Sequence, residues 1–521
     1  MGHSQRPRTG ARNPLFEIDL KLGAAGLRKS SRTIYLELKA AIQEGRLTTG
    51  AKLPPTRQSD AFFGVSRNTM VEVYDRLANE GYVTTRHGAG TYVANKVAAH
   101  RVGVGPRREG PPDHRLNEFW RRPDVTAAIS FWRDRPDNAA EPSKAVQMDF
   151  RPALVDSRLF PFDVLRRVSA KQLRQLERKP ASYKSPQGNQ GNYYLREAIT
   201  RHIALTRAVV CQPDDVLVTS GAQQAFDLIA RALVTRDQTV VAIEDPGYPP
   251  MRVAFAAAGA RLVPIGVDDE GLIIEQLPPN VRVICVCPSH QFPLGVTMSM
   301  RRRRSLVAFA RKCGAVIIED DYDGEFRYDG SPLEALRTSS EADVVFYVGT
   351  FSKCMLPSLR LGFIVAPTWA VRTLIAVKNC LDWHCSTPIQ SGVAGFIAEG
   401  HLARHVRKMR AIYSRRRELL LHSLQEELGE WLEPIAACYG MHVAAVARTP
   451  MNLDLVAESL LRHNVKIHAF SRYFLGPQTK VGLVFGYGAA DLPEISRGLS
   501  HVRRVLQTRS PSARRLTRAT I

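Results

Sequence analysis

The sequence predicts two joined folds: a small helical domain that ends in a β-hairpin, and a larger α/β domain with a mainly parallel sheet. Three observations support this prediction. The 521 residues exceed what one hydrophobic core usually supports. Apolar residues near the N-terminus recur at helical spacing. Past residue 147, short apolar runs alternate with helix-like segments, which is typical of an α/β fold.

The boundaries between these domains follow from composition. Residues 96–146 are rich in Arg, Pro, Gly and Asp and lack sustained periodicity, so we expect a linker there. Two short aromatic islands inside it, NEFWRR and ISFWRD, are candidates for docking on a neighbouring surface. The expected parts are an N-terminal arm (1–27), a first domain (28–95), the linker, a second domain (147–505) and a basic tail (506–521).

Charge and cysteine usage narrow the class of protein. The formal net charge is +22, and the end from Arg497 to Ile521 has seven arginines and no acidic residue. This balance suits a polyanion such as nucleic acid, although a well-solvated basic surface has the same composition. The eight cysteines form no CxxC pair and no Cys/His cluster with metal-ligand spacing, so we expect buried free thiols and no metal site. No apolar stretch suits a signal peptide or a membrane span, so we expect a cytoplasmic protein.

The first domain has the pattern of a winged helix-turn-helix. A Pro turn and a short helix lead to Ser66, which is placed as the N-cap of a helix that opens at Arg67. The segment GYVTTRHGAGTYVA follows as two β-rich runs with a glycine-rich tip. The last helix of this fold enters the major groove, so Arg67, Asn68 and Thr69 are expected to face DNA. The apolar positions that predict the first and last helices are Tyr35, Leu38 and Ile42, then Met70, Val73, Tyr74 and Leu77.

This domain resembles the GntR-type DNA reader over residues 28–94. The resemblance rests on IYLELKAAIQEGRLTTGAKLPPTRQ, VSRNTMVEVYDRLANEGYV and RHGAGTYV. One departure is Val71, where some relatives carry another DNA-contacting arginine. The positions that the resemblance implies as DNA contacts are Arg57, Ser66, Arg67, Thr69, His87 and Gly88.

In the second domain, five apolar runs each end in a polar cluster. Ligands of open α/β sheets bind at the carboxyl ends of the strands, so these clusters are expected to converge on one pocket. The runs are VLVTSGAQQ, VVAIEDPGYP, VRVICVCPSHQ, AVIIEDDYD and VVFYVGTFSK.

One part of this predicted pocket suits a phosphate. Ala222 and Gln223 open a helix, so their backbone N–H groups would point at an anion. Thr350 and Ser352 add hydroxyl groups, and Arg360 offers a guanidinium fork for two phosphate oxygens.

The other part suits an aromatic aldehyde. Asp320 can hold a protonated ring nitrogen, Tyr322 can donate to a phenolate oxygen, and Tyr248 can stack on a flat ring. Lys353 is an amine able to form a Schiff base. Each residue alone is compatible with an ordinary structural role, but phosphate, pyridinium, phenolate and aldehyde together describe pyridoxal 5'-phosphate.

The second domain resembles fold-type I aminotransferases, and the whole chain resembles the MocR branch of bacterial regulators. The motifs are TSGAQQAFDLIARAL, EDPGYP, PSHQFPLGVTMS, IIEDDYDGEFRY and VGTFSKCMLPSLRLGF, and the likeness extends into a smaller C-terminal α+β subdomain. The resemblance implies a pyridoxal-phosphate-binding sensor rather than an enzyme, and a head-to-tail homodimer. It also implies that Tyr183 reaches the phosphate of the neighbouring subunit, although its loop is about three residues longer than usual.

Two departures from the aminotransferase pattern weaken the enzyme hypothesis. Phe292 stands where an asparagine usually bonds the cofactor's phenolate, and His290 or Gln291 is a candidate replacement. Val484 stands where an arginine usually holds the substrate carboxylate, and a valine cannot neutralise that charge.

The alignment at Val484 leaves a second possibility open, in which the neighbouring Arg472 or Lys480 supplies the charge. If Val484 is correctly placed, the expected effector is the cofactor itself, an amine, or an amino compound anchored elsewhere.

Three functions are therefore compared. The first is a transcription regulator that binds double-stranded operator DNA through its head and senses pyridoxal phosphate, with a small amine or amino compound as a further effector. The second is an aminotransferase with an accessory DNA-binding domain. The third is a DNA-binding scaffold with a dead pocket. The run RRRR at 301–304 begins an expected helix and is more typical of a solvated face than of a DNA contact.

Overall fold

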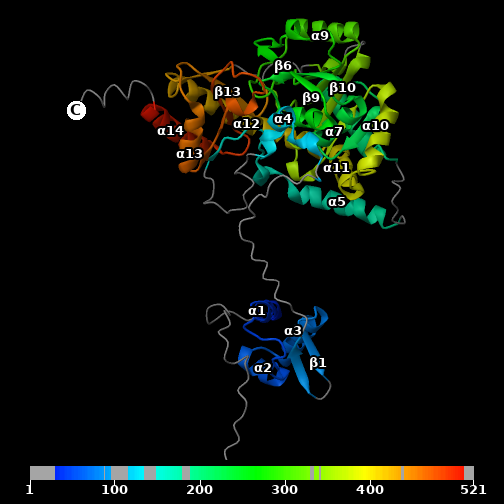
Figure 1. Ribbon diagram of the computed structural model, residues 1–521, viewed down its shortest axis with the longest axis vertical. Helices are drawn as coiled ribbons and strands as arrows, with labels where there is room; N and C mark the ends of the chain where they lie inside the picture. Colours follow the sequence, from blue (N-terminus) through cyan, green and yellow to red (C-terminus); the bar gives the residue numbers. More distant parts are fainter. Residues whose placement is uncertain are drawn as a thin grey trace, which may run out of the picture. The chain divides into compact units, whose positions relative to one another are not determined.

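The computed structural model describes residues 30–86, 89–94, 115, 117–133, 148–178, 188–328, 334–338, 342–435 and 439–509. The chain divides into two compact units, Met1–Asp113 and His114–Ile521 (Figure 1). His87, Gly88, Tyr183, Cys438 and the tail from 510 lie outside the described residues. No helix in the described ranges is long and apolar enough to cross a membrane.

The first unit is the expected winged helix-turn-helix. All the apolar positions that predicted its first and last helices are buried in one cluster, because helical spacing places them on the inner faces. β1 and β2 pair antiparallel from Val83↔Val93 to Arg86↔Gly90. The elements are α1 (Ser31–Gln43), α2 (Thr56–Phe63), α3 (Arg67–Asn79), β1 (Val83–Arg86) and β2 (Gly90–Val93).

Side-chain caps set where two helices of this unit begin. The Ser30 hydroxyl accepts from the backbone N–H of Thr33 at 3.3 Å, and the Ser66 hydroxyl accepts from that of Thr69 at 3.2 Å. Each serine thereby satisfies an N–H group that the first helical turn leaves without a partner.

Part of the expected linker is ordered and belongs to the second unit. The 3-10 helix η2 (Glu118–Arg121) and α4 (Pro123–Arg133) form between residues 117 and 133, and α4 packs on α8 (Pro249–Ala258). Phe119 of the first aromatic island is buried, with the guanidinium of Arg236 4.2 Å from its ring centre.

The second unit is built on an eight-stranded sheet with the order β4-β11-β10-β9-β8-β5-β6-β7. The pairs β10–β9, β9–β8, β8–β5 and β5–β6 are parallel, and β11 runs antiparallel between β10 and β4. The prediction of a mainly parallel sheet is therefore confirmed. The strands are β4 (Val216–Thr219), β5 (Val240–Asp245), β6 (Arg261–Asp268), β7 (Gly271–Leu272), β8 (Val283–Val286), β9 (Val316–Asp321), β10 (Val345–Thr350) and β11 (Gly362–Val365).

Helices cover both faces of this sheet, which explains its continuous apolar strands. Alternate residues of β5 enter different clusters: Val241 and Ile243 pack with α7 and α8, whereas Val240 and Ala242 pack with α9. Figure 1 shows α9 at the top of the view, above β6 and β10, and α7 and α10 below them. The remaining helices are α5 (Phe162–Leu176), α6 (Tyr193–Arg207), α7 (Ala222–Leu233), α9 (Met300–Cys313), α10 (Thr368–Leu381) and α11 (Thr387–Ala398).

The chain ends in the expected smaller α+β subdomain. Its four-stranded sheet has the order β12-β13-β16-β15, and all its pairs are antiparallel. The strand β3 (Met148–Asp149) pairs with β14 (Val465–Lys466), so the start of the second domain is fastened to its end. The elements are α12 (His401–Glu426), β12 (Leu432–Pro434), β13 (His442–Ala447), α13 (Leu453–Arg462), β15 (His468–Ala469), η10 (Phe470–Tyr473), β16 (Gly482–Gly486) and α14 (Leu492–Arg509).

Two expectations about single residues are wrong. The run at 301–304 does begin a helix, but Arg302 and Arg303 are buried rather than solvated. Arg302 donates to the Leu272 carbonyl and pairs with Asp268, and Arg303 donates to backbone carbonyls. These bonds replace the water that burial removes. Among the described cysteines, all are free thiols as expected, but Cys380 is exposed.

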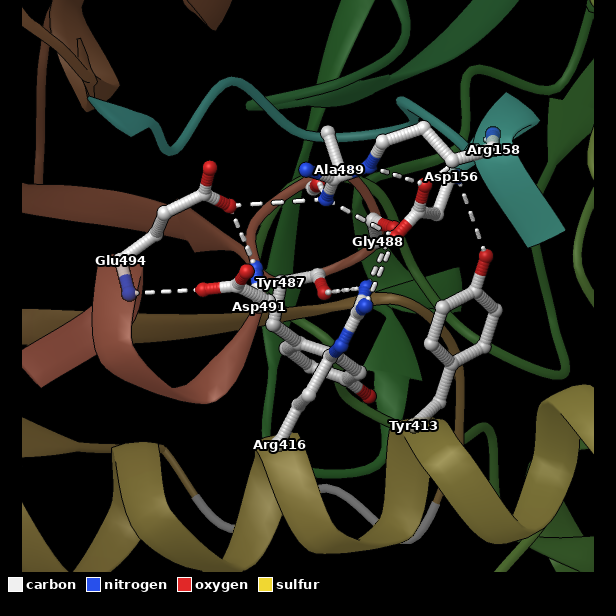
Figure 2. A network of polar contacts seen from close by, with 9 residues as sticks. All are labelled: Asp156, Arg158, Tyr413, Arg416, Tyr487, Gly488, Ala489, Asp491 and Glu494. Atoms are coloured by element: carbon white, nitrogen blue, oxygen red, sulfur yellow. Dashed lines mark hydrogen bonds and ion pairs between the residues drawn. The ribbon is translucent and has the colours of Figure 1, made fainter. Parts of the chain in front are cut away.

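An ion pair inside the second unit fastens the segment after β3 to the subdomain. Arg416 of α12 donates to Asp156 at 2.7 Å, and both side chains are about 5% exposed or less. The same guanidinium donates to the Gly488 carbonyl at 2.8 Å (Figure 2). Arg158 also pairs with Asp156 at 2.8 Å, but 56% of its side chain is exposed. Burial alone would raise the pKa of Asp156, but the two guanidiniums bring it below its usual value.

We predict that the two serine caps each contribute about 1 kcal/mol to the stability of the first unit. Ser30→Ala and Ser66→Ala should each speed hydrogen exchange in the helix that the lost cap begins. Ser500→Ala, which removes a hydroxyl from an exposed position of α14, is the matched control and should leave both helices unchanged. Parent-like exchange in both cap variants would contradict the assignment.

We also predict that the two arginines that pair with Asp156 contribute unequally to the stability of the second unit. Arg416→Met leaves a buried carboxylate with one exposed partner and should destabilise the second unit by about 3 kcal/mol. Arg158→Met removes an exposed partner and should cost less than about 1 kcal/mol. All five tryptophans follow residue 114, so tryptophan fluorescence during urea unfolding reports on the second unit alone. Equal costs for the two variants would refute the distinction.

Candidate functional site

The carboxyl ends of neighbouring strands bring the predicted polar residues together. Asp320 lies at the end of β9, Thr350 ends β10, and Ser220 and Gly221 follow β4. β9 and β10 are parallel neighbours with Asp320 opposite Val348. β11 lies antiparallel between β10 and β4, so β4 runs in the direction of β10 and ends at the same edge.

Lys353 carries an amine whose pKa the site lowers. The amine donates to the Ala153 carbonyl at 2.5 Å. Desolvation lowers the pKa of Lys353 to about 8, against the opposing effects of Asp323 and Asp320. At neutral pH a useful fraction of the amine is therefore unprotonated, which is the form that attacks a carbonyl carbon.

Asp320 presents a buried oxygen that lacks a partner in the described part of the chain. Its side chain is 2% exposed, and Oδ1 makes no hydrogen bond. The other oxygen, Oδ2, lies 3.8 Å from the Cys287 thiol. Burial, together with Asp321 and Asp323, raises the pKa of Asp320 to about 8. A cationic N–H placed against Oδ1 would supply the missing bond and restore the carboxylate form.

The N-terminus of α7 lies beside Arg360, as the predicted phosphate site requires. Gly221 is its N-cap with φ 84°, and no side chain caps the first turn. A Cβ atom at Gly221 would lie 3.0 Å from a terminal nitrogen of Arg360, so glycine allows this guanidinium to approach the helix end. Arg360 donates to the Ser220 carbonyl at 3.0 Å, and the Thr350 hydroxyl donates to that of Ser352 at 3.0 Å.

The aromatic residues lie together, but the Tyr322 hydroxyl is already engaged. The rings of Tyr248 and Tyr322 are near-parallel, at 13°, with centres 6.4 Å apart. Tyr322 donates to the His290 backbone carbonyl at 3.0 Å, and its oxygen lies 2.9 Å from His290 Nδ1. Phe292 packs edge-on against both tyrosines. Gln291 donates to the Pro246 carbonyl instead, so His290 is the neighbour that reaches Tyr322.

The residues predicted near the carboxylate position differ in burial and in bonding. Val484 is fully buried in the apolar cluster that contains Ala444, Phe470 and Tyr473. Arg472 lies on η10, and its Nε is buried without a hydrogen-bond partner in the described residues. The next residue, Tyr473, accepts from the Gly247 N–H at 3.1 Å, so η10 is joined to the loop that carries Tyr248.

Sequence reasoning missed the groups that hold the site in place. The Ala153 carbonyl, Asp323 and His442 all border the predicted residues but come from other segments. Backbone carbonyls leave no signal in a sequence, and His442 is far from His290 along the chain. Asp323 was included in the predicted polar clusters only as the last residue of the DDYD motif.

The described residues that were predicted to face DNA lie on the surface of the first unit. Arg57 is exposed at the start of α2, and Arg67 and Asn68 are exposed in the first turn of α3. Ser66 and Thr69 hydrogen-bond to each other at 2.8 Å, so their hydroxyls also stabilise the helix start.

Comparison with known proteins matches both units. Residues 30–93 match the model of bacterial regulatory proteins of the gntR family, and residues 157–478 match that of aminotransferase class I and II. An archaeal alanine:glyoxylate aminotransferase of known structure has a TM-score of 0.67 at 22% identity, covering 76% of this chain and 100% of that one. That likeness concerns the fold alone.

Full-length relatives share both units. The chain is 33% identical over 494 residues to the probable rhizopine catabolism regulatory protein MocR of Rhizobium meliloti, covering 94% of this chain and 96% of that protein. It is 30% identical over 475 residues to the pyridoxine biosynthesis transcriptional regulator PdxR of Corynebacterium glutamicum, covering 89% and 94%. The chain therefore belongs to the gntR family of bacterial regulatory proteins, in the MocR branch, and is a DNA-binding transcription regulator with an aminotransferase-like domain.

Proposed function

We propose that the aminotransferase-like domain binds pyridoxal 5'-phosphate and uses it to set the affinity of the head for operator DNA. The observation that carries this proposal is the pairing of Lys353, whose pKa is lowered to about 8, with Asp320, whose buried Oδ1 lacks a partner among the described residues. An amine kept partly neutral beside a carboxylate that awaits a cation suits an aldehyde on a pyridinium ring.

The chain's own residues divide the work of holding the cofactor. Ala222 and Gln223, at the start of α7, would bind the phosphate with Thr350, Ser352 and Arg360. Asp320 would fix the ring nitrogen, and Tyr248 would cover the ring face. Tyr322, braced by His290, would stand at the phenolate edge. When bound, the cofactor supplies an aldehyde for amines and a ring that withdraws electrons.

We further propose that the domain senses rather than turns over substrate. Val484 is buried in an apolar cluster and offers no charge to an α-carboxylate. Arg472 is the guanidinium better placed to anchor an acidic group of an effector, because η10 is bonded to the Tyr248 loop. The expected effector is the cofactor itself, a small amine or an amino compound, and the expected assembly is a head-to-tail homodimer in the cytoplasm. Transaminase turnover should be negligible.

We predict that pyridoxal phosphate alone changes operator affinity in the parent protein and has no such effect in Lys353→Ala. Capture of the cofactor should quicken as the pH rises toward 8, because the unprotonated amine is the nucleophile. The experiment titrates cofactor-free protein on its operator, then adds a panel of α-amino acids and amines. Lys312→Ala, on the exposed face of α9, is the matched control.

The outcomes separate the alternatives. No response to the cofactor, together with a strong response to a common α-amino acid, would overturn the proposal. Steady turnover of an amino-acid and keto-acid pair would favour an enzyme with an accessory DNA-binding domain. Absence of borohydride-reducible cofactor on Lys353 would favour the scaffold.

We predict that Arg67→Ala weakens operator binding by about 1–3 kcal/mol and relaxes specificity at one position, if the side chain reads a base. If it contacts phosphate instead, binding to all sequences should weaken and the salt dependence should fall. Arg304→Ala removes an equally exposed arginine from α9 and should change neither. Binding by Arg67→Ala as tight as the parent at matched salt would show that α3 is not the reading helix.

A further inference from the structure

Two buried histidines from distant parts of the chain meet beside the candidate cofactor site. His290 follows β8, and His442 begins β13 of the smaller subdomain. Their ring centres are 4.5 Å apart, and the residues are 2% and 1% exposed. Neither residue is used by the DNA-reading head, and His442 has no role in the proposed cofactor binding.

The hydrogen bonds of His442 fix its tautomer. Its Nε2 lies 3.0 Å from the Pro293 carbonyl, which can only accept, so Nε2 carries the proton. Its Nδ1 is then a bare lone pair, and it has no hydrogen-bond partner among the described residues.

His290 is oriented in the same way through its other nitrogen. Its Nδ1 lies 3.0 Å from Asp323 and 2.9 Å from the Tyr322 oxygen. Since Tyr322 gives its own proton to the His290 carbonyl, Nδ1 is the donor to both neighbours. The lone pair of His290 is therefore on Nε2, which is buried and has no partner in the described part of the chain.

Two unprotonated imidazole nitrogens that are buried close together are suited to bind a metal ion. Metal-binding histidines almost always donate their second N–H to a carboxylate or a backbone carbonyl, as His290 does to Asp323 and His442 does to Pro293. One ligand atom from each of His290, Asp323 and His442 lies within 4.8 Å of the others. An ion with bonds of about 2.1 Å joins ligand atoms up to about 4.2 Å apart, so the spacing of these three side chains is close to that of residues around one ion.

Gly440 makes this arrangement possible. A Cβ atom there would lie 1.9 Å from His290 Cε1 and 2.6 Å from an oxygen of Asp323. With φ 85°, Gly440 adopts the left-handed region that other residues avoid, and it stands two residues before His442. The absence of a side chain at position 440 therefore leaves the space that the His290 ring and the Asp323 carboxylate occupy.

We propose that His290 Nε2 and His442 Nδ1 bind one divalent transition-metal ion of the zinc class, with Asp323 as the residue that orients His290. Imidazole ligands select zinc-like ions over magnesium and calcium, which take oxygen ligands. The remaining coordination positions are open to water or to a polar group of an effector. Since His290 also touches Tyr322, the ion would lie against the candidate cofactor pocket.

The test uses the full chain, stripped with a chelator and without pyridoxal phosphate. Zinc chloride is titrated by calorimetry, and cobalt(II) is titrated while its visible bands are recorded. The parent should bind one ion that His442→Phe does not bind, because phenylalanine fills the same space without a nitrogen. Asp323→Asn should weaken binding by about 10- to 100-fold through the lost orientation of His290.

A control and a direct measurement keep the result decisive. His463→Gln disrupts a different histidine pair, in which the rings of His463 and His501 stack with centres 5.6 Å apart, and should leave the site intact. X-ray absorption at the zinc edge of the parent should show two imidazole ligands, whether or not the variants fold. No binding by the parent, unchanged binding by a folded His442→Phe, or loss of the ion in His463→Gln would each overturn the proposal. Because no cofactor is present, a negative result leaves the proposed function standing.

Discussion

Asp320 and Thr350 are buried at the carboxyl edge of the central sheet, Lys353 is partly buried beside them, and the behaviour of the site depends on that burial. β4, β9 and β10 end there and supply, in that order, a helix N-terminus, a carboxylate and a lysine-bearing turn. Desolvation is the leading cause of the lowered pKa of Lys353 and of the raised pKa of Asp320. In water these groups would both be charged at neutral pH; here burial makes each charged form costly unless a ligand supplies the counter-charge, and it shifts both pKa values toward the neutral forms.

The Lys353 amine also connects the candidate site to the segment that begins at Ala153. It donates to Ala153, which adopts a left-handed φ of 67°, and three residues later Asp156 is bound to Arg416 of α12. Figure 2 shows that the same guanidinium holds the Gly488 carbonyl. The segment between Ala153 and Asp156 is thus held at one end by the site and at the other by the smaller subdomain. A ligand that bonds to the Lys353 amine removes one of these two attachments. Binding in the pocket can therefore change the position of this segment and of the elements that contact it.

The sequence predicted much of the fold because its signals are periodic or local. Helical spacing predicted α1 and α3, and apolar runs predicted strands that are buried on both faces. It predicted the strand-end residues Asp320 and Thr350 because parallel strands place their carboxyl ends together. It failed where tertiary contacts decide. Arg302 looks like a solvated charge, and only the fold reveals Asp268 and the Leu272 carbonyl beside it. The meeting of His290 with His442 likewise depends on how two sheets pack, which no local pattern encodes.

The departures from the aminotransferase pattern are consistent with a sensor on physical grounds. An enzyme must hold its substrate more tightly in the transition state than in the ground state, which requires fixed groups at the phenolate and at the α-carboxylate. Phe292 and Val484, the residues that the motifs predict at those positions, are buried in one apolar cluster. A regulator needs only that its ligand bind two conformations unequally. Lys353, Asp320 and the α7 N-terminus are enough to bind a ligand more tightly in one conformation than in the other. A regulator can therefore lose the groups that drive turnover and keep the groups that bind the ligand. Asp320, His290 and His442 keep buried polar atoms without a partner in the described part of the chain, and they are therefore the residues through which an effector would act.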